Sequence, residues 1–191
     1  MSIYAISDLH LAKSVDKPMD IFGAQWDNYM DRLYENWNQS ISGDDLVIIP
    51  GDVSWATYLE ECCEDFRFLD SLPGKKIILK GNHDYWWTTV TKMNEYVKCR
   101  GFDSLVFLNN NSYIIDDIAI CGTRGWNSPL DNDFRIEDRK IYNRELKRLE
   151  MSLDSIADRK DKTIICAMHY PPVSIDGKAT EFMDIMHKYN V

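Results

Sequence analysis

The chain has 191 residues, of which 45% are hydrophobic, so it can bury one full core but is too short for two comfortable domains. Its formal net charge of -9 disfavours nucleic acid or an anionic membrane as a partner. Five cysteines form neither a disulfide framework nor a Cys-x-x-Cys metal site, and no run of residues reaches membrane-spanning length. We therefore expect a single cytoplasmic domain, without a membrane partner, that spans residues 1–191.

Short apolar runs separated by polar turns predict the strands. The runs at residues 3–6, 46–49, 77–79 and 163–168 each end in a polar turn, as buried strands of an α/β protein do. Two more runs, at 112–115 and 118–121, flank Asp116-Asp117 and predict a β-hairpin.

Apolar residues at helical spacing predict the helices. Four stripes are present, and they run from Trp26 to Trp37, from Trp55 to Leu69, from Tyr142 to Ile156 and from Phe182 to Met186. We expect their aromatic residues, including Tyr58, to lie in the core. The irregular stretch at 122–138 is the best candidate for a loop that shapes a substrate site. The predicted class is mixed α/β.

Metal-competent side chains follow the predicted strands, where open α/β sheets hold their ligands. These residues are Asp8, His10, Asp52, Asn82, His83, Asp84 and His169, which include three of the four histidines. Oxygen and imidazole ligands without thiolate favour Mn, Fe or Zn over a structural cysteine-rich zinc site. Two divalent cations would make this pocket locally cationic and suited to a phosphate oxyanion, although the protein is acidic.

Local spacing gives a reason for several of these positions. Asp8 and His10 are two residues apart, so a chain that is still extended there would point both side chains toward one ion. Gly51 and Gly81 precede Asp52 and Asn82, and the missing Cβ lets the backbone turn sharply and approach an ion closely.

The order of these motifs resembles a known family. Asp8-Leu9-His10, Gly51-Asp52, Gly81-Asn82-His83-Asp84 and His169 are similar to the motifs of the calcineurin-like metallophosphoesterases. The resemblance implies a four-layer αββα sandwich of α+β type with two divalent ions (Mn, Fe or Zn) at the strand ends. It implies that Asp8 and His10 bind one ion, Asn82 and His169 bind the other, and Asp52 bridges both, so that a shared hydroxide attacks phosphorus.

The resemblance also assigns the two remaining residues of the set. His83 corresponds to the family's histidine that donates a proton or hydrogen bond to the leaving group, and we expect Asp84 to orient it. The family's closing Gly-His-x-His motif is absent from this sequence. We therefore expect a chain that is truncated at its C-terminus and lacks the last strands of the fold.

The function that follows is metal-dependent hydrolysis of a phosphomonoester or phosphodiester, on a phosphorylated small molecule or nucleotide. The alternative is a non-catalytic scaffold of the same fold that binds a protein partner; the missing motif favours it, and His83 and Asp84 count against it. Arg124, after another predicted strand, has two interpretations, a contact to a phosphate oxygen or an ordinary surface arginine.

Overall fold

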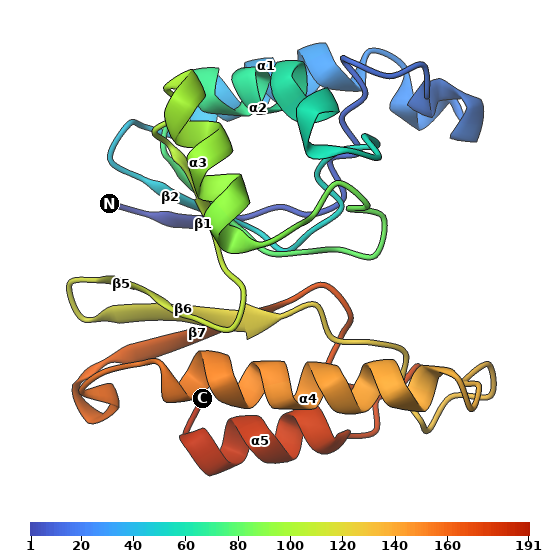
Figure 1. The fold of residues 1–191 in the computed structure, drawn as a ribbon, viewed down its shortest axis with the longest axis vertical. Helices are drawn as coiled ribbons and strands as arrows, with labels where there is room; N and C mark the ends of the chain where they lie inside the picture. The colour runs from blue at the N-terminus through green and yellow to red at the C-terminus, as the bar shows by residue number, and fades with distance from the viewer. The chain divides into compact units, whose positions relative to one another are not determined.

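A computed structural model describes residues 1–191 and divides them into two compact units, Met1–Phe107 and Leu108–Val191. Each unit has its own sheet, helices and hydrophobic core, and each is described by itself (Figure 1). The mixed α/β class predicted from the sequence is confirmed.

The first unit is built on a parallel sheet. Its strands lie in sequence order: β1 (Ile3–Ala5), β2 (Leu46–Ile49), β3 (Lys75–Ile78) and β4 (Leu105–Phe107). All four residues of β2 are buried, so both faces of the strand are covered. This explains why the strand is continuously apolar in the sequence, since a parallel strand seldom has a solvent face.

Three helices connect these strands. They are α1 (Tyr29–Ser40), α2 (Cys63–Ser71) and α3 (Val90–Arg100), with the short 3-10 turns η1 (Met19–Phe22), η2 (Ala24–Trp26) and η3 (Leu59–Cys62) before α1 and α2. Right-handed crossovers between strands in sequence order put every connecting helix on the same face of the sheet, as Figure 1 shows. The core between them contains Trp37 of α1, Phe66 of α2 and Met93 of α3.

The second unit has a mixed sheet of β5 (Tyr113–Ile115), β6 (Ile118–Thr123) and β7 (Thr163–Met168). β5 and β6 form the predicted antiparallel hairpin, with Asp116 in the left-handed region at φ 49°, and β6 pairs with β7 in parallel. The helix α4 (Asp138–Asp154) runs along β6, and α5 (Glu181–Tyr189) packs beside α4 (Figure 1). A short turn, η4 (Arg159–Asp161), precedes β7.

Most predicted elements are confirmed, with three differences. The core prediction is wrong for Tyr58, which is 65% exposed, and for Trp26 and Trp55, which lie outside the hydrophobic core. Trp55 and Tyr58 precede η3 and α2, so they are not on the buried face of that helix. The strand β4 and the helix α3 were not predicted. The stretch between Thr123 and Asp138 is irregular, as expected. No helix combines the length and the apolar character needed to cross a bilayer.

Candidate metal centre

The segments that follow β1 and β2 lie side by side and are joined by backbone hydrogen bonds. The amide of Asp8 donates to the carbonyl of Gly51 at 3.1 Å, and the amide of His10 donates to the carbonyl of Asp52 at 3.0 Å. A parallel bridge at Leu11 continues the pairing. The two segments that hold the first three predicted ligands are therefore one rigid pair, beyond the last residues of either strand.

Three of the predicted ligands have a left-handed backbone. The φ angle is 59° at Asp8, 47° at His10 and 53° at Asp52. Residues with a Cβ seldom adopt this region, although Asp and His do so more often than most, and such strain gathers at functional sites. The expectation that an extended chain aligns Asp8 with His10 is therefore wrong in its geometry: two separate left-handed turns bring these side chains together.

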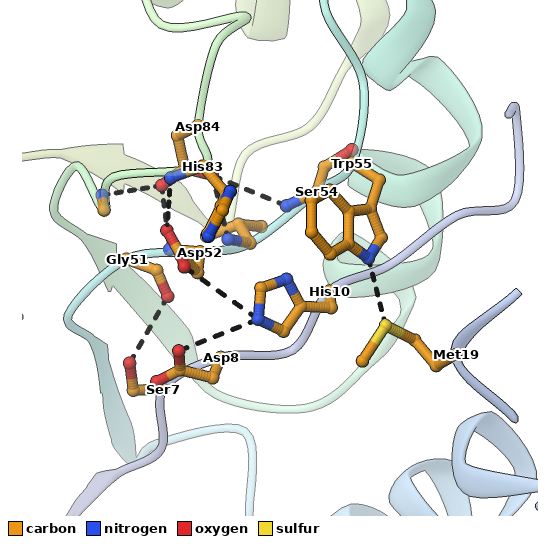
Figure 2. A network of polar contacts seen from close by, with 12 residues as sticks. Ser7, Asp8, His10, Met19, Gly51, Asp52, Ser54, Trp55, His83 and Asp84 are labelled. Carbon is orange, nitrogen blue, oxygen red and sulfur yellow. Dashed lines mark hydrogen bonds and ion pairs between the residues drawn. The ribbon is translucent and has the colours of Figure 1, made fainter. Parts of the chain in front are cut away.

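These three side chains form a compact cluster of possible ligand atoms. Nε2 of His10 lies 3.7 Å from Oδ1 of Asp8 and 3.9 Å from Oδ2 of Asp52, and one ligand atom from each residue falls within 4.8 Å of the others (Figure 2). Asp52 is 2% exposed, whereas the Asp8 side chain is 54% exposed. The cluster therefore reaches from the interior of the unit to its surface.

Aromatic groups fix the orientation of the His10 imidazole. The ring of Trp55 stacks on it, with centroids 4.7 Å apart and planes at 22°, and Trp26 meets it edge-on at 6.5 Å (Figure 2 shows the first contact). The Tyr29 hydroxyl donates to the His10 carbonyl at 2.8 Å, and burial raises the pKa of Tyr29 to about 12. The imidazole is thus held with Nε2 toward the two carboxylates.

Two glycines allow the segments after β2 and β3 to touch. A Cβ on Gly51, whose φ is +106°, would lie 2.4 Å from Cα of Gly81. A Cβ on Gly81 would lie 2.0 Å from Oδ1 of Asp52. The close approach that these glycines permit is to the opposite backbone and to the Asp52 carboxylate. A close approach of this backbone to an ion stays a prediction.

Asp84 is fully buried beneath this contact, and its carboxylate is surrounded by N–H donors. It accepts from the amides of Gly81 (2.7 Å), Val53 (2.8 Å), Asp52 (2.9 Å) and Ser54 (3.5 Å) and from the indole of Trp86 (3.0 Å). Burial raises the pKa of Asp84, and the backbone donors oppose this by stabilising the charged form. These contacts give no support to the hypothesis that Asp84 orients the His83 ring. Instead, Asp84 connects the segment after β2 with the segment after β3.

His83 lies at the edge of the cluster. Its amide donates to Oδ1 of Asp52 at 2.8 Å, and its ring lies 5.9 Å from that of His10 and 5.0 Å from that of Trp55. Its Nδ1 is buried and has no hydrogen-bond partner (Figure 2 shows the ring). Asn82, between Gly81 and His83, is half-buried.

The remaining candidates belong to the second unit. His169 directly follows β7, and its ring meets that of Tyr170 edge-on at 5.3 Å. The Arg124 side chain is only 10% exposed and lies 3.3 Å from the buried Glu145 carboxylate, with its guanidinium over the Trp126 ring at 4.4 Å. The interpretation of Arg124 as an ordinary surface arginine is therefore wrong.

Comparison with known proteins decides the family. The model of the calcineurin-like phosphoesterases matches residues 1–191. The chain belongs to this family. No curated protein matches its sequence.

Two solved structures resemble this phosphoesterase. Phosphopantetheinyl hydrolase from Mycobacterium tuberculosis has 14% sequence identity and a TM-score of 0.53, and the match covers 98% of this chain and 78% of that one. The protein of unknown function AQ665 from Aquifex aeolicus has 21% identity and a TM-score of 0.46, with 88% and 90% covered. At these identities the first likeness shows the fold alone.

The donor set of this phosphoesterase fits the divalent ions that its family implies. Ions such as zinc hold oxygen and nitrogen ligands at about 2.0–2.2 Å, so two ligands of one ion lie roughly 3–4 Å apart. The distances from His10 to Asp8 and Asp52, 3.7 and 3.9 Å, fall in this range. Two carboxylates and an imidazole, without thiolate, suit Mn, Fe or Zn.

Sequence reasoning missed a second buried carboxylate beneath the site. Asp65 of α2 is fully buried and accepts from the Lys13 amide at 2.8 Å and from the Ser54 hydroxyl. It therefore ties together the continuations of both ligand segments. A polar residue on the buried face of a predicted helix was the available signal, because a buried carboxylate requires partners.

Proposed function

We propose that this phosphoesterase is a metal-dependent hydrolase of phosphomonoesters or phosphodiesters. The observation that supports it best is the cluster of Asp8, His10 and Asp52, which three left-handed residues bring within coordination distance of one another. Strain of this kind is maintained only where the surroundings over-determine it, and here Asp84 and the paired segments do so. The substrate class is a phosphorylated small molecule or nucleotide.

In this proposal Asp8 and His10 would be ligands of one divalent ion, Asn82 and His169 would be ligands of a second, and Asp52 would be a ligand of both. The burial of Asp52 and the exposure of Asp8 support these roles, since a bridging ligand needs a fixed position and an outer ligand needs access to solvent and substrate. When bound, the ions would activate water as a nucleophile and polarise the phosphoryl oxygens.

The chain's own groups would prepare the site in three ways. Trp55 holds the His10 imidazole in one plane, so the ligand needs little ordering when an ion arrives. The hydrogen bond from the His83 amide fixes Oδ1 of Asp52 and leaves Oδ2 turned toward His10. The Nδ1 of His83 is buried, so we assign the other ring nitrogen, Nε2, the donation of a hydrogen bond or proton to the leaving oxygen.

The first test measures metal binding apart from catalysis. Mn²⁺ or Zn²⁺ is titrated into the metal-free chain by calorimetry, and the same protein is assayed with 4-nitrophenyl phosphate and bis(4-nitrophenyl) phosphate. We expect binding and hydrolysis of at least one ester. Asp52→Asn should weaken binding at least tenfold, because it removes a negative charge from the ligand set.

Asp103→Asn is the matched control, because Asp103 is an exposed aspartate of the same unit and lies outside the cluster. It should bind metal and turn over ester as the unchanged protein does. Metal binding without hydrolysis of either ester would replace this proposal with the scaffold function. If Asp52→Asn bound metal as tightly as Asp103→Asn did, the proposed centre would be wrong.

A further inference from the structure

A hollow of about 760 Å³ lies in the first unit beside His83. Its two walls are residues 57–60 and 85–88, with α3 behind them. The first wall continues the segment that holds Asp52 and Trp55, and the second continues the segment that holds Asn82 and His83. The hollow therefore shares the loop after β2 with the cluster of Asp8, His10 and Asp52, and its other wall continues the loop that holds Asn82 and His83.

The mouth of this hollow is aromatic and unusually exposed. Tyr58 is 65% exposed and Tyr85 is 59% exposed, and both line it together with the half-buried Trp87. Isolated apolar residues on a surface are common, but several large aromatic rings around one concave site indicate a binding surface. Flat rings stack on such side chains because each presents a π-face at low entropic cost.

The ring of Tyr85 connects the hollow to the proposed chemistry. It meets the ring of His83 edge-on, with centroids 6.1 Å apart. A group that stacks on Tyr85 would therefore lie beside the histidine to which we assign contact with the leaving oxygen. Under the proposed function, this is the side of the phosphorus on which the leaving group departs.

Charge in the hollow is balanced. Lys92 and Arg100 stand against Glu60 and Glu95, and the Arg100 guanidinium already lies over the Tyr96 ring at 3.6 Å. A second hollow in this unit has a volume of about 570 Å³ and is lined by three carboxylates (Asp20, Asp27 and Asp31) and two lysines (Lys13 and Lys17). The excess of negative charge there disfavours a phosphorylated ligand.

We infer that the hollow between residues 57–60 and 85–88 binds a flat aromatic or heteroaromatic ring in the leaving group of the substrate. This inference rests on the proposed function and narrows it to phosphoesters that include such a ring, either nucleotides or aryl esters. Tyr58 and Tyr85 are the stacking residues.

The test compares esters that differ in the ring alone. The kcat/KM of the metal-loaded chain is measured for AMP and for ribose 5-phosphate, with Tyr58→Leu, Tyr85→Leu and Tyr85→Phe. We expect AMP to be preferred, and each Leu variant to lower the AMP to ribose 5-phosphate ratio about tenfold, the loss of one stacking partner. Tyr85→Phe should keep the ratio, since it keeps the ring.

Tyr34→Leu is the matched control, because Tyr34 is a 49% exposed tyrosine of the same unit that does not line the hollow. It should leave the ratio unchanged. Phenyl phosphate and ethyl phosphate are measured as a second pair, to distinguish the two sources of the ring. If the Leu variants lower only the phenyl to ethyl ratio, the substrates are aryl esters. If they lower only the AMP to ribose 5-phosphate ratio, the substrates are nucleotides. Because phenoxide leaves more readily than ethoxide, only the change of the phenyl to ethyl ratio in the Leu variants counts. Ratios that both Leu variants leave unchanged for both pairs would overturn the inference.

Binding of adenosine and of phenol, followed by quenching of tryptophan emission, separates this inference from the proposed function. If no ester is hydrolysed but either ring compound binds and Tyr58→Leu weakens that binding, the proposed function fails and the ring site stands. If no ester is hydrolysed and neither compound binds, both fail. Hydrolysis without any preference for ring-bearing esters leaves the proposed function standing alone.

Discussion

Replacing Gly81 with Ala tests whether the close approach of the segments after β2 and β3 positions Asp52. A Cβ at this position would lie 2.0 Å from Oδ1 and 2.3 Å from N of Asp52, whereas real Cβ contacts stay beyond 3.0 Å. The carboxylate or the loop must therefore move by about 1 Å. The φ of Gly81 is not positive, so alanine adds no backbone strain of its own and the effect is steric.

The magnitude follows from two separate costs. Overpacking of this kind lowers the free energy of unfolding by about 1–3 kcal/mol. Displacement of a ligand's support weakens metal affinity by roughly 10–100-fold. We expect Gly81→Ala to show the first in urea unfolding with EDTA present, and the second in calorimetric titration with Mn²⁺.

The control is Gly43→Ala, which makes the same chemical change where nothing lies within 4 Å and φ is not positive. Its free energy of unfolding should stay within about 0.5 kcal/mol of the unchanged protein, as surface substitutions usually do. If Gly81→Ala unfolded and bound Mn²⁺ as Gly43→Ala did, the positioning of Asp52 by this contact would be refuted.

Three further predictions concern buried charges. Asp84→Asn turns an amide N–H toward N–H donors, so we expect its free energy of unfolding in urea to be about 1–3 kcal/mol lower, and its stabilisation by Mn²⁺ to be smaller. Equal values in variant and parent would show that Asp84 does not hold the segments after β2 and β3 together. Burial lowers the pKa of Lys76 from 10.5 to about 8, so between these pH values the unfolded chain binds more protons and the Lys76 contribution to stability rises with pH. The free energy of unfolding is measured in urea for the parent and for Lys76→Met across this pH window, and we expect it to rise with pH in the parent relative to the variant. A difference between the two proteins that does not change with pH would contradict the lowered pKa of Lys76. The buried Glu145 carboxylate forms ion pairs with Arg124, Arg144 and Arg148. Glu145→Gln should therefore lower the free energy of unfolding in urea by about 3 kcal/mol, because it leaves the Arg124 charge without its partner. The double variant Glu145→Met, Arg124→Met should regain much of that free energy, because it removes both charges.

The parts of the fold that could be predicted are those with a local cause. The strand β2 is apolar at every position because both of its faces are buried, and the hairpin of β5 and β6 is marked by a polar pair between two apolar runs. The strand β4 has only three residues, too few to distinguish it from any short apolar run. The helix α3 has apolar residues that alternate with charged ones less regularly, although its Thr89 N-cap and the left-handed Gly101 at its end were available signals.

The candidate site divides in the same way. Position after a strand was enough to select Asp8, His10 and Asp52, which the structure brings together. The orientation of each side chain was not predictable, because it depends on left-handed turns and on hydrogen bonds between segments far apart in the sequence. Asp84 illustrates the difference: its motif suggested a partner for His83, and its partners are backbone amides brought from two loops. The assignment of each residue to an ion stays a prediction.

The left-handed backbone at three candidate ligands has a consequence for how this protein could change. Glycine adopts that conformation without the steric cost that a Cβ brings, about 1–2 kcal/mol per residue and less for Asp. At Asp8, glycine would relax the backbone and delete a candidate ligand in a single substitution. The Asp8 side chain is 54% exposed, so selection for stability alone would favour the loss of its carboxylate. Thermodynamic improvement and retention of a candidate ligand therefore oppose each other at this position.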